Sequence, residues 1–153
     1  MAMKADNALF LDTNTLVYAN IIEAPLHQQA LTAINNARLA GRTIWISRQV
    51  IREYLATLTR PQTFGQLPKA TVLAQVVQFI SQFEVADDTI AVTRQLVALI
   101  ENHQVGGKQV HDANIVATML ANGIPCLLTH NTKDFERFNG AIKIEGLGYP
   151  VNG

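Results

Sequence analysis

Short apolar runs alternate along the chain with longer segments in which apolar residues recur every three or four positions. A run of four or five apolar residues is typical of a buried strand, and the longer spacing is typical of a helix that buries one face. Regular alternation of the two predicts an α/β fold with a parallel sheet. Because the 153 residues contain no internal repeat and no linker, we expect one domain over residues 1–153.

The bounds of the expected elements follow from these runs and from the residues that flank them. Strands are expected over residues 9–12, 43–46, 83–85, 126–129 and 142–145. Helices are expected from residue 14 or 15, over 26–40, 48–59, 69–82, 89–103 and 110–121, and as a single turn over 133–137. Ser47 and Asp88 are the expected N-caps of the third and fifth helices, and residues 62–68 are expected to form a loop.

The composition, with 48% hydrophobic and 16% charged residues, indicates a globular protein. Twelve basic and twelve acidic residues cancel, so the chain lacks the overall positive charge that marks many nucleic-acid-binding proteins. A nucleic-acid substrate is still compatible with this balance, because metal-binding carboxylates would account for part of the acidic count.

The location and the redox state of the protein can also be inferred from the sequence. Residues 1–7 hold one lysine and no apolar stretch of the length found in signal peptides or membrane spans. We therefore expect a cytoplasmic protein with no membrane segment. Cys126 is the single cysteine, and its apolar surroundings predict a buried structural thiol.

Four acidic residues are candidates for a functional site. Asp12 directly follows the first strand, where an uncompensated buried carboxylate is unfavourable. Glu53 lies two turns into the helix after the second strand, Asp112 opens the helix before the fourth strand, and Asp134 follows that strand. Each also has an ordinary structural explanation, as a helix cap, a first-turn helix acid or a solvated helix residue.

The four acids can converge, because parallel α/β sheets gather their sites at the carboxyl ends of the strands. Crowded carboxylates repel one another, and a hard divalent cation relieves that repulsion. Mg²⁺ or Mn²⁺ prefers oxygen ligands, whereas the histidines and the cysteine lack zinc spacing. A carboxylate-held Mg²⁺ or Mn²⁺ suggests phosphate chemistry, because the ion polarises a phosphoryl group and lowers the pKa of an attacking water.

At these positions the sequence resembles the PIN-domain ribonucleases, particularly the VapC-type toxins of toxin–antitoxin pairs. The matching segments, in order, are Phe10–Asn14, Arg52–Tyr54, His111–Ile115 and Thr129–Phe135, and together they span nearly the whole chain. The resemblance implies a three-layer α/β/α fold with a central, mostly parallel sheet. It also implies metal-dependent endonucleolytic cleavage of RNA.

The resemblance assigns roles to the three leading acids. Asp12 and Asp112 would contact Mg²⁺ directly or through water, and Glu53 would position a water or a second ion.

The fourth position of the site stays open between Asn131, which has only a neutral oxygen, and Asp134. Thr129 matches a hydroxyl residue that lines the family site, and Asn14 matches a polar residue behind the first acid, although it could equally be a helix cap. The basic residues considered for contacts with RNA phosphates, or simply as solvated charges, are Arg48, Arg52, Lys108 and Lys133.

The resemblance also implies protein partners. An RNA-cleaving toxin needs a cognate antitoxin that binds and blocks its site, and the family commonly forms homodimers. Residues 73–83 and the loop around Phe64 could supply an apolar surface for such contacts, although core packing explains them equally well.

Other functions fit parts of the sequence. The segment Asp12–Thr15 approximates the Asp-x-Asp-x-Thr start of haloacid dehalogenase-like phosphatases, with Asp12 as nucleophile, but Asn14 replaces the second acid. A PIN-like fold could also act as a non-catalytic binding module, against which the complete set of acids argues. A dinucleotide-binding fold is excluded, because no Gly-rich turn follows the first strand.

Overall fold

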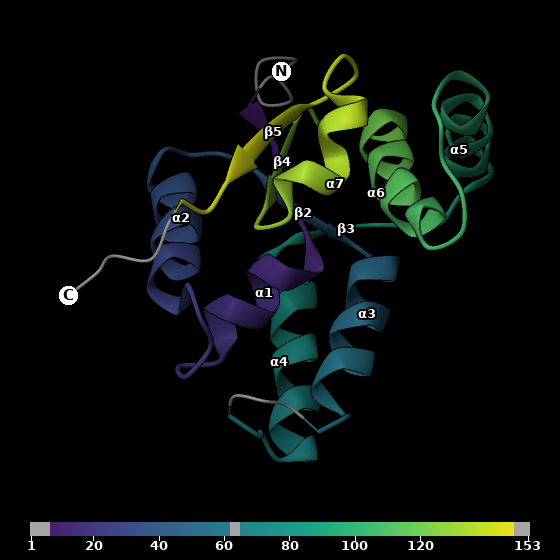
Figure 1. Cartoon of the computed structure of the whole chain (residues 1–153). Helices are drawn as coiled ribbons and strands as arrows, with labels where there is room; N and C mark the ends of the chain where they lie inside the picture. The colour runs from purple at the N-terminus through teal and green to yellow at the C-terminus, as the bar shows by residue number, and fades with distance from the viewer. Residues whose placement is uncertain (1–6, 62–64, 149–153) are drawn as a thin grey trace.

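The structure, a computed structural model, describes residues 7–61 and 65–148. Within this part of the chain, five strands form one all-parallel sheet in the order β3-β2-β1-β4-β5. Helices cover both faces of the sheet, so the expected α/β fold with three layers is confirmed (Figure 1). The strands are β1 (Leu9–Leu11), β2 (Ile44–Ser47), β3 (Glu84–Ala86), β4 (Cys126–Thr129) and β5 (Lys143–Gly146).

Helices connect the strands in sequence. In Figure 1, α1, α3 and α4 lie below the strands, and α5 and α6 pack against each other on the right. The helices are α1 (Thr13–Asn20), α2 (His27–Leu39), α3 (Arg48–Leu58), α4 (Lys69–Gln82), α5 (Ile90–Asn102), α6 (Gln109–Ala121) and α7 (Thr132–Phe135), which the 3-10 turn η2 (Glu136–Phe138) follows.

The order of the strands reverses at β1. From β1 the chain adds β2 and then β3 on one side, and α5 and α6 then carry it back to β4 on the other side of β1. Open α/β sheets place their sites at such a switch point, outside the carboxyl ends of the strands. The residues that follow β1 and β4 are therefore the ones to inspect for function.

Strand β1 is the most enclosed part of the sheet, since none of its three residues is more than 1% exposed. Phe10 pairs with Trp45 of β2 on one side and with Leu127 of β4 on the other. Coverage on both faces explains why this strand is a continuous apolar run without alternation. A slip of one residue would move the carboxylate of Asp12 toward the core, so burial specifies the register that places it at the edge.

Five helices, α1, α2, α5, α6 and α7, begin one or two residues away from the expected position, and the caps of α1 and α5 explain two of these shifts. Helix α1 starts at Thr13, one residue early, because Asp12 is its N-cap. The expected cap Asp88 is wrong: the Thr89 hydroxyl accepts a hydrogen bond of 3.3 Å from the backbone N–H three residues on and so caps α5. The Asp88 carboxylate instead pairs with Arg52 of α3 at 3.2 Å.

Cys126 is buried, as expected for a structural thiol. Over the described residues, no helix combines the length and the apolar character that crossing a membrane requires. Residues 1–6, Phe64 and the first part of the expected loop, residues 62–64, lie outside the part of the chain that the structure describes.

Truncation of Phe10 to alanine should lower the free energy of unfolding by about 3–5 kcal/mol, because the side chain is fully buried at the centre of the sheet. Leu39, which is 86% exposed, provides the control: Leu39→Ala should change stability by no more than about 0.5 kcal/mol. Urea unfolding of both variants measures the difference, and equal losses would contradict this account of the core.

Candidate active site

The Asp12 carboxylate lies just beyond the carboxyl end of β1 and is only 7% exposed. Its Oδ1 accepts a hydrogen bond from the backbone N–H of Thr13 (2.8 Å). Its Oδ2 accepts from the Thr129 hydroxyl (2.7 Å) and from the Asn14 amide (3.1 Å). Burial raises the pKa of Asp12 to about 6 in spite of these hydrogen bonds, and the charge of Glu53 adds to the shift.

Asn14 and Thr129 connect the elements around Asp12. The Asn14 Oδ1 accepts a hydrogen bond from the backbone N–H of His130 (3.0 Å), which ties α1 to the turn after β4. The Thr129 hydroxyl oxygen accepts from the backbone N–H of Asn131 (3.0 Å) in the same turn. Both residues expected to support the site therefore touch its first acid.

Glu53 faces the same region from α3. Its Oε1 accepts a hydrogen bond from the Thr13 hydroxyl (2.7 Å), and its Oε2 accepts from the Gln49 amide (3.1 Å). Gln49 is itself buried: its amide also donates to the backbone carbonyl of His111 (2.8 Å), and its Oε1 accepts from Asn114 (2.8 Å). Gln49 thereby joins α3 to α6 and places the residue after His111 beside Glu53.

That next residue is Asp112, a half-buried side chain in the first turn of α6. Its pKa is raised to about 6, chiefly by burial and then by the charges of Asp12, Asp134 and Glu53, while Arg137 opposes the shift. The four acids expected from the sequence therefore lie within electrostatic reach of one another.

The two candidates for the fourth position occupy different places. Asn131, the N-cap of α7, lines a cavity together with Asp12 and Asp112. Asp134 is exposed in the first turn of α7 and is absent from the described lining of that cavity, although its charge raises the pKa of Asp112. Asn131 thus lines the cavity, whereas the charge of Asp134 acts on Asp112 from outside the described lining.

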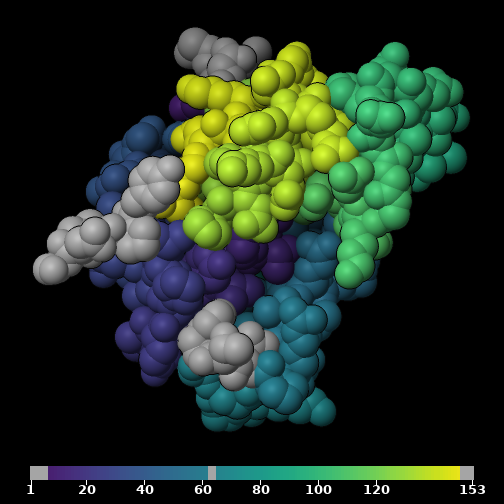
Figure 2. Space-filling model, viewed as in Figure 1, coloured from purple at the N-terminus to yellow at the C-terminus, as the bar shows by residue number. Residues whose placement is uncertain are grey.

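This cavity measures about 470 Å³ and lies at the switch point of the sheet. Figure 2 shows the N-terminal segment, in purple, between the yellow-green C-terminal part and the blue of α3. Three of the expected acids come together there. The lining residues are Asp12, Thr13, Asn14, Val17, Tyr18, Glu53, Thr57, Arg60, Asp112 and Asn131.

The donor set of the cavity suits a hard divalent cation. The charge of Glu53 raises the pKa of Asp12, and the neighbouring acids raise that of Asp112, so a cation between them would relieve the repulsion. Within residues 7–61 and 65–148, no group of three or more His, Cys, Asp or Glu side chains is arranged to hold an ion by itself. The oxygen donors that line the cavity fit Mg²⁺, because this ion is usually bound through only one or two carboxylates and keeps several waters as its other ligands.

The structure does not bring the four basic candidates for RNA contacts into this cavity. Arg48 and Arg52 pair with two consecutive acids that follow β3, at 2.6 and 3.2 Å. Lys108 is exposed just before α6, and Lys133 lines a separate cavity of about 760 Å³ that also contains Arg137.

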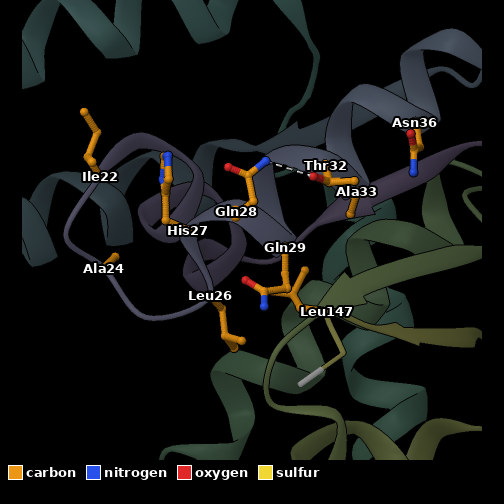
Figure 3. Close-up of a pocket in the computed structure, with 10 residues that line it drawn as sticks. All are labelled: Ile22, Ala24, Leu26, His27, Gln28, Gln29, Thr32, Ala33, Asn36 and Leu147. Carbon is orange, nitrogen blue, oxygen red and sulfur yellow. Dashed lines mark hydrogen bonds between the residues drawn. The ribbon is translucent and has the colours of Figure 1, made fainter. Parts of the chain in front are cut away.

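A further cavity, of about 640 Å³, lies along α2 (Figure 3). Its wall is mainly apolar and amide side chains, and Figure 3 shows the Gln28 amide donating to the Thr32 hydroxyl (3.2 Å). Among its described lining residues none is acidic, so it lacks the carboxylates that distinguish the cavity over Asp12.

Six residues of the site were missed in the sequence: Thr13, Val17, Tyr18, Gln49, Thr57 and Arg60. A partial signal existed, because Gln49 lies four residues before Glu53 and Arg60 seven residues after it, which puts all three on one helix face. That signal cannot show that Gln49 reaches a second helix, since the contact depends on how α3 and α6 pack.

Comparisons with known proteins identify the family and the fold. The family model described as "PIN domain" matches residues 9–141. VapBC2 from Rickettsia felis, bound to a DNA fragment from its promoter, is similar with a TM-score of 0.66, 23% identity and coverage of 91% of this chain and 98% of that chain. A toxin–antitoxin complex from Klebsiella pneumoniae is similar with a TM-score of 0.64 and 22% identity, and the match covers 94% of this chain and 99% of that chain. VapC20 from Mycobacterium tuberculosis, a toxin that cleaves the sarcin–ricin loop, is similar with a TM-score of 0.58 and 20% identity. This match covers 78% of this chain and 87% of that chain. No significant match is found among curated protein sequences.

The raised pKa values of two acids predict how the stability of the metal-free protein depends on pH. Asp12 and Asp112 have folded pKa values of about 6, above the ordinary 3.8, so the folded state binds more protons than the unfolded state between those values. The free energy of unfolding of the chelator-treated protein should therefore fall as pH rises from about 4 to about 7.

The variant Asp112→Asn removes the part of this loss of stability that comes from ionising Asp112. Because the side chain is half exposed, solvent screening limits the gain at pH 7 to about 1 kcal/mol, or about 2–4 °C in Tm. At pH 4 the two proteins should melt together. Thermal unfolding with chelator at both pH values measures this, and a lower Tm for the variant at pH 7 would disprove the repulsion.

Proposed function

Because the chain belongs to the PIN-domain family, we propose that it is a Mg²⁺- or Mn²⁺-dependent endoribonuclease that acts as the toxin of a toxin–antitoxin pair. The observation that carries the proposal is the meeting of Asp12, Glu53 and Asp112 in one cavity at the switch point of the sheet. Membership of this family leaves no role for the haloacid dehalogenase-like alternative. The chain would act as a single nuclease domain over residues 1–153.

In this proposal Asp12 and Asp112 hold the ion, with Asn131 offering a neutral oxygen nearby. When bound, the ion polarises the scissile phosphoryl group and lowers the pKa of the attacking water. Glu53 orients that water or a second ion, because the Thr13 hydroxyl and the Gln49 amide hold its two oxygens in place. Asp134 adds negative charge at the rim without entering the cavity.

The pKa values near 6 favour this assignment. A protein carboxylate that is hard to ionise without a cation gains the most when a cation binds. Thr129 and Asn14 both donate to Oδ2 of Asp12, which leaves its orientation fixed before any ligand arrives. Such preorganisation avoids the cost of ordering the ligand during the reaction.

Similar proteins of known structure support an RNA substrate and an antitoxin as the partners of this chain. One neighbour is a toxin–antitoxin complex, and another is a toxin that cleaves the sarcin–ricin loop. We propose that this chain likewise acts on RNA in the cytoplasm and that a cognate antitoxin blocks the cavity.

A homodimer is also proposed. Leu73, Val77 and Ile80 lie at i, i+4 and i+7 on α4 and are 48%, 68% and 59% exposed. Exposed apolar residues at this spacing form one stripe along the helix, as expected of a helix that packs on a partner.

Substitution of Asp112 by Asn should reduce RNA cleavage in Mg²⁺ by roughly 100-fold or more, because a ligand carboxylate is lost while the side-chain shape is kept. Asp88→Asn, which alters an acid paired with Arg52 outside the cavity, is the matched control and should keep its activity. Chelator should abolish cleavage by the wild type, and added Mg²⁺ or Mn²⁺ should restore it.

The same pair of variants tests the biological role. Expression of the wild type and of Asp88→Asn should arrest growth, and expression of Asp112→Asn should not. Cleavage by Asp112→Asn at the wild-type rate would overturn the proposed site. Lack of both cleavage and metal binding in the wild type would favour the non-catalytic binding module.

The variant Val77→Lys places a charge in the middle of the α4 stripe and should convert the dimer to a monomer in sedimentation experiments. Ile90→Lys, at a residue of α5 that is 70% exposed, supplies the comparison and should leave the dimer intact. A wild type that sediments as a monomer would rule out the dimer.

A further inference from the structure

Helix α3 presents one face to the acidic cavity. Glu53, Thr57 and Arg60 follow one another at intervals of four and three residues, and all three line the cavity. Residues at these intervals lie on the same side of a helix or its immediate continuation. Arg60 comes two residues after the last residue of α3, so it lies at the end of this wall farthest from the sheet.

The charges of the cavity are unevenly distributed. Asp12, Glu53 and Asp112 occupy the end next to the strands, whereas Arg60 is the one basic side chain among the described residues that line it. An RNA strand would bring several negative phosphates to a wall that already carries three carboxylates. A cation at the acids can serve the scissile phosphate, but a neighbouring phosphate needs another positive group.

Resting on the nuclease function proposed above, we propose that Arg60, with Thr57 beside it, binds a phosphate of the RNA backbone next to the scissile one. The planar guanidinium group can donate two parallel hydrogen bonds to phosphate oxygens, and the Thr57 hydroxyl can donate one more. Glu53 lies five residues before the last residue of α3, a rise of roughly 8 Å, and Arg60 comes two residues after that end. It therefore contacts a phosphate away from the reacting centre and is a binding residue, not a catalytic one.

The test uses steady-state cleavage of a single-stranded RNA by the full chain in Mg²⁺. Arg60→Ala should raise KM about tenfold and leave kcat within about twofold, because the lost contact helps to bind substrate and transition state equally. Arg60→Lys should recover part of the loss through its charge. Arg94→Ala, at an exposed arginine of α5, is the matched control and should leave KM unchanged.

A second measurement separates phosphate binding from a structural role. In the Asp112→Asn background, in which cleavage should be slow enough for binding to be measured, the logarithm of RNA affinity is measured against the logarithm of salt concentration. Removal of one phosphate contact by Arg60→Ala should reduce the magnitude of the slope by about one, whereas Arg94→Ala should not change it.

The outcomes distinguish this inference from the function on which it rests. If the wild type cleaves RNA but Arg60→Ala and Arg94→Ala have equal KM values and salt slopes, Arg60 does not bind the backbone and the nuclease assignment stands. A fall in kcat and Tm with an unchanged salt slope would show that Arg60 is structural, which also refutes the proposal. If the wild type cleaves no RNA under any metal condition, both ideas fail together.

Discussion

The burial of the Asp12 carboxylate at the end of β1 is the constraint on which the rest of the site depends. An apolar strand enclosed on both sides brings this group to the sheet edge, and three hydrogen-bond donors offset part of its loss of water. They do not offset all of it, because the pKa of Asp12 remains raised to about 6. The same residue caps α1, so the helix direction and the position of the carboxylate are set together.

Gln49 extends this constraint across the molecule. Helix α3, which precedes β3, must meet α6, which lies within the long return from β3 to β4, for Glu53 to face Asp112, and the chain itself leaves these two acids 59 residues apart (112 minus 53). The buried amide of Gln49 touches Glu53, the carbonyl of His111 and the side chain of Asn114, and every polar atom of that amide is used. One buried hydrogen-bonding group thus fixes the spacing between α3 and α6, which makes it a positioning residue.

The sequence predicted those parts of the fold and site that depend on local pattern. The strand before Asp12 and the helix around Glu53 follow from periodicity and from capping, and all five strands fall within two residues of the expected bounds. The contacts of Thr13 and Gln49 could not be predicted, because they depend on how helices far apart in sequence pack. Asp88 shows the converse: a good cap residue pairs with Arg52, and Thr89 takes the capping role. Helix spacing places Arg60 on the face of Glu53 and Arg52 off that face, but only the packing of α3 shows that this face lines the cavity.

The two sides of α3 explain how a chain with no net charge could act on RNA, the polyanion proposed as its substrate. On one side Arg48 and Arg52 are neutralised by the acids that follow β3, so they contribute little to a long-range positive field. On the other side Glu53 and Arg60 line the cavity seven residues apart. The Glu53 carboxylate lies near Asp12 and Asp112. Recognition of RNA would then depend on the order of charges inside one cavity: carboxylates that need a cation at the inner end, and a guanidinium group at the outer end. A weak overall attraction favours specificity by fit within the cavity, because contacts made only there distinguish a well-placed strand from one that is merely nearby.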